Sequence, residues 1–218
     1  MEGLLGSSID EKNIELAKTL FCLRQDMDVY CLIGVNASKI EANAIGTLFF
    51  GHVQKRMIEC IVLAICKLYE DEKRNELNSI QGVLNSLSRR TPRPTIEKSS
   101  VQDFVRQQGG PCKETDLLKA LQATFDQFRN KFSDELNRFK TARDKVIAHS
   151  EYQVIIDGLP SFDTMERLFY FGADFYAVVS SSFVGCGPDD IRNRREVKSN
   201  FRKLLAKIGV TDIETDMK

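Results

Sequence analysis

Tryptophan is absent from the 218-residue chain, and there are only two histidines, His52 and His149. An excess of one charge is also lacking, because 31 basic residues balance 31 acidic residues. No net field therefore draws the protein to nucleic acid or to a membrane surface. Any site for a polyanion must be local.

Motifs of several common protein classes are missing as well. The six cysteines form no CxxC pair and no Cys/His cluster with zinc spacing, which predicts buried free thiols in a reducing compartment. There is no glycine-rich phosphate loop and no GxSxG motif, so NTPase and serine hydrolase functions have no support. The longest apolar run, IECIVLAICKLY, is interrupted by charged residues well short of the roughly 20 residues that span a bilayer. With no charged-then-apolar leader at the start, we expect a cytoplasmic protein without a membrane partner.

Nearly all of the chain has helical periodicity. Apolar stripes predict helices at residues 8–33, from the capping-box pattern Ser38/Glu41 to Leu68 as one long helix, at 73–87, from about 114 to 149, at 162–183, and in a last segment that ends at Gly209. The stretch SRRTPRPTIEKSS predicts a loop, and YQVIID is the one strand-like run. We predict an all-α antiparallel bundle with long helices, forming one domain over 1–218, with a motif-bearing core at about 38–150 and C-terminal helices at 161–208.

The segment RDKVIAH near the end of the Phe-rich helix carries the residues with the clearest chemistry. Phe125, Phe132, Phe139 and Val146 recur every seven residues and predict a buried face. On a helical wheel Arg143 lies roughly 40° to one side of Phe139 and His149 roughly 80° to the other, so both flank the apolar stripe. The simplest alternative is a surface histidine near a helix C-terminus, where positive charge is favoured.

This segment resembles the RxxxxxH motif of the HEPN superfamily, small helical bundles in which an arginine, a polar residue and a following histidine form a ribonuclease site. Arg143, Asp144 and His149 occupy these positions. The upstream stretch from Leu48 to Leu87, with its LAICKLY turn, resembles the long second helix of the abortive-infection, AbiU-type branch. The resemblance covers about residues 40 to 150 and implies an HEPN-like fold.

The resemblance also implies metal-independent RNA cleavage, with no cofactor, at a cleft of a homodimer. The chemistry suits the residues: a histidine can move protons at neutral pH, and an arginine can bind a phosphate through two donors. One imidazole does not easily serve as acid and base together, and a two-fold partner supplies a second His149. His52 is a second candidate for that role. Asp144 has two open interpretations, an orienting residue or a solvated carboxylate.

Several basic residues are candidates for contact with RNA phosphates. Lys140 and Lys145 lie nearest the motif, while Arg194, Arg195 and Lys198 belong to a basic, amphipathic last helix that is equally consistent with a solvated surface. The acidic clusters in YEDE and at Asp189–Asp190 are typical of helix ends, and we predict no metal site.

The sequence leaves two functions open. The first is a toxin or phage-defence endoribonuclease that an antitoxin protein can hold silent. The second is a non-catalytic module of the same fold that binds RNA or a partner protein.

Overall fold

A computed structural model describes residues 8–43, 46–71, 78–89, 97–111, 116–149, 158–187, 191 and 195–214. Every regular element among these residues is a helix, which confirms the all-α prediction. The elements in chain order are α1 (Ile9–Val35), α2 (Ala37–Ala42), α3 (Thr47–Tyr69), α4 (Ile80–Arg89), α5 (Lys98–Gln107), α6 (Leu117–Lys131), α7 (Ser133–His149), α9 (Phe162–Val179), the π-helix η1 (Ser180–Val184) and α10 (Arg195–Lys207). The strand-like run at 152–157 and most of the proline-containing loop lie outside the described residues.

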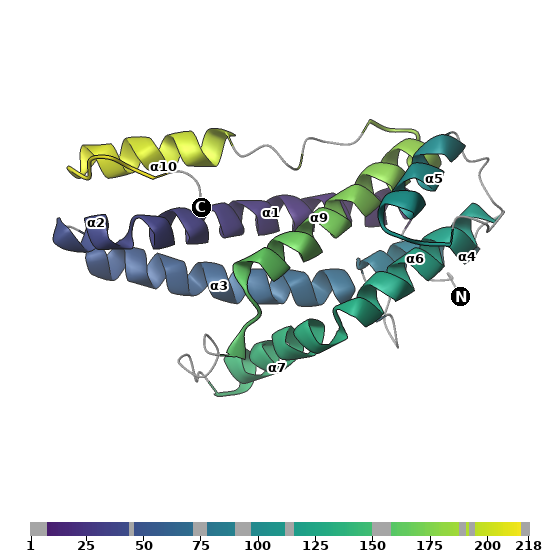
Figure 1. Cartoon of the computed structure of the whole chain (residues 1–218), viewed down its shortest axis with the longest axis horizontal. Coiled ribbons are helices and arrows are strands. Elements are labelled where there is room, and N and C mark those ends of the chain that lie inside the picture. Colours follow the sequence, from purple (N-terminus) through teal and green to yellow (C-terminus); the bar gives the residue numbers. More distant parts are fainter. Residues whose placement is uncertain are drawn as a thin grey trace, which may run out of the picture.

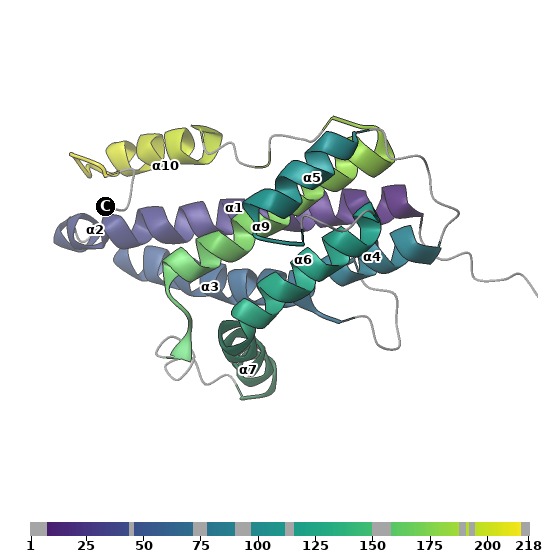
Figure 2. The same cartoon turned by 45° about the vertical axis from the view of Figure 1, so that its right-hand side comes forward.

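The centre of the molecule is the pair of long helices α1 and α3, which lie side by side (Figure 1). Helix α9 crosses this pair, α5 packs on α9, and α6 packs on α5 and α4 (Figures 1 and 2). Helix α7 packs on α3, whereas α10 lies beside α1 on the side away from α3. None of the described helices is both long enough and apolar enough to cross a membrane.

Helix α1 begins where the sequence predicts. Ser8 is its N-cap and forms a complete capping box with Glu11, in which each side chain accepts the other residue's backbone N–H. The predicted stripe is buried, since Leu16, Leu20 and Leu23 have no exposed surface. Burial of three leucines contributes about 5 to 9 kcal/mol before the cost of ordering the chain.

The prediction of one long helix starting at Ser38 is wrong. Ser38 lies inside the short helix α2, whose N-cap is Asn36 with no side-chain cap hydrogen bond. A new helix, α3, begins after Gly46, which has a φ of 79°. This left-handed conformation suits glycine and cannot continue a right-handed helix. The helix is therefore interrupted at Gly46, and α3 starts in a new direction, along α1.

The predicted helix from about 114 to 149 is likewise two helices. Phe132 separates α6 from α7 with φ −107° and ψ 22°, outside ordinary helix geometry. Its ring is nearly buried and packs on Phe128 at a centroid distance of 4.8 Å. The bend allows α6 to follow α5 while α7 turns onto α3 (Figures 1 and 2).

Aromatic side chains fill the junction of α3, α6 and α9. The Phe128 ring stacks on Phe171 at 3.8 Å, and the Tyr69 ring stacks on Phe125 at 6.3 Å. The Tyr69 hydroxyl donates a hydrogen bond to the Leu168 carbonyl at 2.7 Å, which satisfies its one polar group in this buried position. This contact fixes the C-terminal end of α3, where the candidate site begins.

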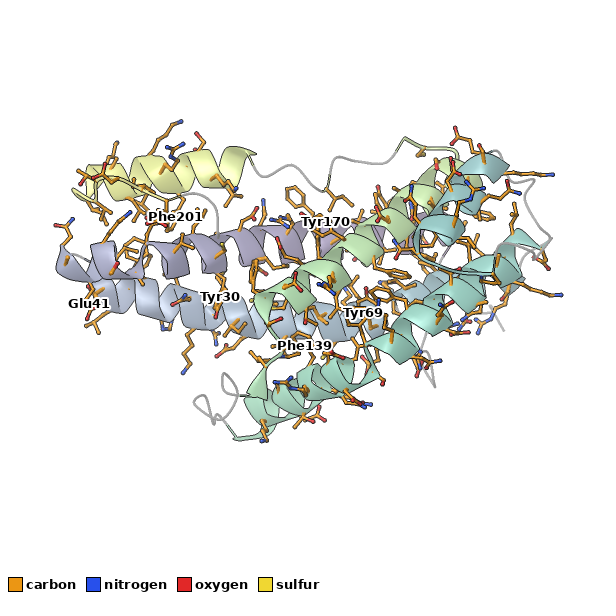
Figure 3. All side chains as sticks on the ribbon, viewed as in Figure 1. Tyr30, Glu41, Tyr69, Phe139, Tyr170 and Phe201 are labelled. Atoms are coloured by element: carbon orange, nitrogen blue, oxygen red, sulfur yellow. The ribbon has the colours of Figure 1, made fainter. Side chains whose placement is uncertain are left out.

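A second apolar cluster joins α10 to the C-terminal end of α1, to α2 and to the N-terminal end of α3. Phe201 packs edge-on against Phe50 at 6.0 Å, and Leu205 is fully buried (Figure 3 labels Phe201). The chain after α10 returns to α2, where the buried Asn36 accepts the backbone N–H of Glu214 at 2.9 Å and donates to its carbonyl at 2.9 Å. The predicted C-terminal end at Gly209 is confirmed, because Gly209 has a left-handed φ of 86°.

Candidate functional site

The candidate site lies where α7 meets the C-terminal end of α3. Phe139 and Ala142 dock α7, with Phe139 fully buried (labelled in Figure 3) and Ala142 nearly so. Arg143 follows Ala142 and lies at the edge of this contact, with 20% of its side chain exposed. The seven-residue repeat thus predicts the buried face correctly at Phe125, Phe132 and Phe139, and Arg143 flanks it as expected, whereas the side chain of Val146 lies outside the described part of the structure.

Two carboxylates hold the guanidinium of Arg143. Its Nε donates to Asp144 Oδ1 at 3.0 Å, and its Nη2 lies 3.0 Å from the same oxygen. Its Nη1 donates to Glu70 Oε1 at 3.2 Å. Asp144 therefore covers one edge of the guanidinium, and Glu70 reaches the far nitrogen from another helix.

These contacts set the electrostatics of Arg143. Burial opposes its charge, but the hydrogen bonds to Asp144 and Glu70 outweigh burial and raise its pKa. The guanidinium stays protonated at any physiological pH, with two negative charges beside one positive charge. In this state the site offers little net attraction for a phosphate.

A second arginine, Arg129, pairs with Asp71, the residue that follows Glu70. Arg129 of α6 donates to both carboxylate oxygens of Asp71, with Nη2 3.0 Å from Oδ2. Glu70 and Asp71 come directly after the last residue of α3, where the helix dipole disfavours negative charge. The two arginines offset this, so Glu70 and Asp71 connect α3 to α7 and to α6. We call Glu70, Asp71, Arg129 and Arg143 the arginine clasp.

Cys66 lies one turn before Glu70 on α3, half-buried. Burial raises the pKa of its thiol to about 11, and the positive charge of Arg143 partly opposes this rise. The thiol is therefore protonated at neutral pH and not a ready nucleophile. The described cysteines are free thiols, but the prediction that they are buried is wrong, because Cys22, Cys60 and Cys186 are exposed and Cys31 and Cys66 are only partly buried.

A third arginine holds the other side of α7. Arg138 donates from Nε to the Gly158 carbonyl at 2.7 Å and from Nη2 to the Leu159 carbonyl at 2.9 Å. This bidentate contact ties α7 to the chain that returns toward α9. The orientation of α7, and with it that of Arg143, is thus fixed from both sides.

The other predicted site residues are distributed unevenly. Lys140 is exposed and Lys145 half-exposed on the same helix as Arg143. His149 is the last residue of α7, and its side chain lies outside the described part of the structure. Lys198 is on α10, beside α1 and away from α7 (Figure 1), so it is not brought to Arg143. Arg194 and the side chain of Arg195 lie outside the described residues.

His52 does not join Arg143 within one chain. It is exposed on α3, 18 residues before Glu70, and this separation corresponds to about 27 Å along a helix. Arg143 contacts Glu70, whereas His149 is six residues, or about 9 Å, farther along α7. His149 is therefore the histidine whose backbone lies nearer to Arg143.

Sequence reasoning missed the arginine clasp partners Glu70, Asp71 and Arg129. The YEDE segment is visible in the sequence, but there it indicates only a helix end. Its pairing depends on contacts across 73 and 58 residues, which no local pattern reveals. Among the described residues, no group of three or more histidines, cysteines or carboxylates can hold a metal ion.

The helices and the RxxxxxH helix define an all-α, HEPN-type protein. The model of the AbiU2 HEPN family matches residues 9–189, well over half of the chain. The chain therefore belongs to the AbiU2 family of abortive-infection HEPN proteins. No curated protein and no solved structure matches it. The match includes α1 and α7, whereas α10 lies outside it.

Proposed function

We propose that the protein is a metal-independent endoribonuclease of a toxin or phage-defence system, active in the cytoplasm as a homodimer. The observation that carries the proposal is the position of Arg143. A packed helix holds it at the surface of the bundle, one and a half turns before His149 on α7, inside an HEPN match. Membership of the family supports a role in defence and does not by itself establish cleavage.

In the proposed reaction a ribose 2′-hydroxyl attacks the adjacent phosphorus. One His149 takes the hydroxyl proton, and His149 of a second copy gives a proton to the departing 5′-oxygen. Arg143 binds the phosphate and stabilises the extra negative charge of the phosphorane. The P–O5′ bond breaks, and the products are a 2′,3′-cyclic phosphate and a 5′-hydroxyl.

Asp144 and the two lysines of α7 take supporting roles in this proposal. Asp144 receives two contacts from Arg143, so we assign it an orienting role, although its side chain is also 63% exposed to solvent. Lys140 and Lys145 offer positive charge to the neighbouring phosphates. Lys198 lies on α10, away from Arg143. We propose that Lys198, together with Arg194 and Arg195, contacts RNA away from the scissile bond.

A second function deserves a test because Arg143 is neutralised by two carboxylates. A chain fixed in this state is a binding module that docks RNA through its lysines rather than Arg143, or docks a partner protein such as an antitoxin, without cleavage. Incubation of the purified protein with single-stranded RNA in EDTA separates the two functions. We expect cleavage by the wild type and its loss in Arg143→Ala and His149→Ala, with unchanged helical content. Binding of RNA without cleavage by the wild type selects the module instead.

The homodimer has its own test. Wild-type protein is mixed with an excess of the His149→Ala chain, which is inactive alone, and the two are allowed to exchange subunits. If the two copies share one site, a hybrid dimer holds a single imidazole and lacks the acid or the base, so activity falls with the square of the wild-type fraction. A fall in simple proportion to the wild-type fraction, in a mixture that has demonstrably exchanged, contradicts the shared cleft.

A further inference from the structure

The Glu70 contact on Arg143 differs from the Asp144 contact in a way that bears on ligand binding. Asp144 follows Arg143 directly on α7 and interacts with both Nε and Nη2. Glu70 comes from α3 and makes a single hydrogen bond to Nη1, at 3.2 Å. Orientation of the guanidinium is therefore supplied by Asp144, and the Glu70 contact is not needed for it.

Glu70 is also well suited to leave. Its backbone is extended, with φ −73° and ψ 142°, so it is not held in a helical turn. Exposure does not distinguish the two carboxylates, since Asp144 is 63% exposed and Glu70 43%, but only Asp144 has two contacts with Arg143 from the same helix. Glu70 caps the C-terminal end of α3, where the helix dipole repels a carboxylate. An exposed ion pair with a single contact contributes little to stability. An anion that also binds a second cation can therefore displace the Glu70 carboxylate from Arg143.

A phosphate oxygen has the same charge-assisted affinity for Nη1 as a carboxylate oxygen. An RNA backbone brings further phosphates within reach of Lys140 and Lys145, which Glu70 does not engage. Binding of RNA at Arg143 thus exchanges one ion pair for several.

We propose that Glu70 is an internal competitor for Arg143. In the free chain the Glu70 carboxylate binds Nη1 of the Arg143 guanidinium, and an RNA phosphate oxygen takes its place on binding. The inference rests on the proposed function for the identity of the ligand. It makes Glu70 an autoinhibitory residue of the site and Asp144 the residue that keeps the guanidinium in place during the exchange.

The arginine clasp supplies a matched control. Asp71 is the next residue, carries the same charge and pairs with Arg129 rather than Arg143. Glu70→Gln and Asp71→Asn therefore change the net charge equally at neighbouring positions, and only the first removes a negative charge from contact with Arg143. Thermal unfolding and circular dichroism of both full-length variants verify that the bundle is intact.

The experiment measures binding of a fluorescein-labelled single-stranded RNA and its cleavage in EDTA. We expect Glu70→Gln to bind about fivefold more tightly than the wild type, the range that a half-exposed ion pair allows, with Asp71→Asn within about twofold of it. The gain disappears when Arg143→Ala is added. Equal effects of the two variants, or weaker binding by Glu70→Gln, overturn the proposal.

A second readout does not depend on RNA. Phenylglyoxal modifies accessible guanidinium groups, and mass spectrometry of the peptide containing Arg143 reports its rate. We expect Glu70→Gln, but not Asp71→Asn, to quicken modification of Arg143, and inorganic phosphate to slow it again. If wild-type protein neither binds nor cleaves RNA, the proposed function fails while this measurement still tests the competition. An unchanged rate in Glu70→Gln overturns it.

Discussion

The most severe test of the fold is at Arg24, a fully buried cation of α1. Its Nη2 donates to Asp28 Oδ1 at 2.6 Å, and both side chains are at most 4% exposed. Its Nη1 lies 3.7 Å from Glu166 Oε1 on α9, and its guanidinium lies over the Phe169 ring at 5.2 Å. Arg24 therefore connects α1 to α9 through charge and through packing.

The loss of folding stability on substitution of Arg24 depends on which charges remain buried. Arg24→Ala leaves the buried Asp28 carboxylate without its guanidinium, and loss of one member of a buried ion pair costs about 3 to 5 kcal/mol. Replacing both residues, as Arg24→Met with Asp28→Leu, removes the uncompensated charge. Such a double replacement is expected to stay within about 2 kcal/mol of the wild type.

Urea unfolding followed by far-UV circular dichroism measures both variants, since the chain has no tryptophan for fluorescence. With a slope of about 2 kcal/mol per molar, Arg24→Ala lowers the midpoint by roughly 2 M at an unchanged slope. The reasoning is refuted if the single variant loses less than about 1 kcal/mol, or if the double variant is less stable than the single.

Three other changes test separate parts of the structure. Burial raises the pKa of Asp26 to about 6, so the stability of the wild type falls as pH rises from about 4 to 6. Asp26→Asn should add about 1 to 2 kcal/mol of stability above pH 6 and nothing at pH 4. Thermal unfolding measured across this pH range tests it. Gly110→Ala places a Cβ 2.1 Å from Thr124 Oγ1 and should cost about 1 to 3 kcal/mol in urea unfolding, partly restored by adding Thr124→Ala. Asn36→Ala removes the hydrogen bonds to Glu214 and should cost about 1 to 3 kcal/mol, with faster hydrogen exchange of the Glu214 amide; unchanged exchange contradicts the role of Asn36 in holding the segment after α10.

Periodicity predicts most helices of this chain but not where they break. The stripe of α1 and the start of a helix at residue 162 are local signals, and both are confirmed. The breaks at Gly46 and Phe132 are not predicted, because the apolar repeat continues through them and tertiary packing decides the bend. Phe132 in particular has no Gly or Pro beside it and bends where its ring packs on Phe128.

The sequence likewise predicts only the part of the candidate site that lies on one helix. Arg143, Asp144 and His149 lie on one helix, so their spacing carries information that survives folding. Glu70 and Arg129 meet the site only through contacts between distant segments, and no sequence pattern indicates them. Family membership likewise extends from residue 9, well before the stretch whose motifs are recognisable by eye.

The central claim is that Arg143 and His149 cleave RNA through the neighbouring 2′-hydroxyl without a metal. Product analysis tests this most directly, using an RNA cleaved in EDTA and a matched RNA with a 2′-O-methyl group at the cleavage position. We predict a 2′,3′-cyclic phosphate and a 5′-hydroxyl from the first RNA and no cleavage of the second. A 5′-phosphate product, or equal cleavage of the methylated RNA, would contradict the claim.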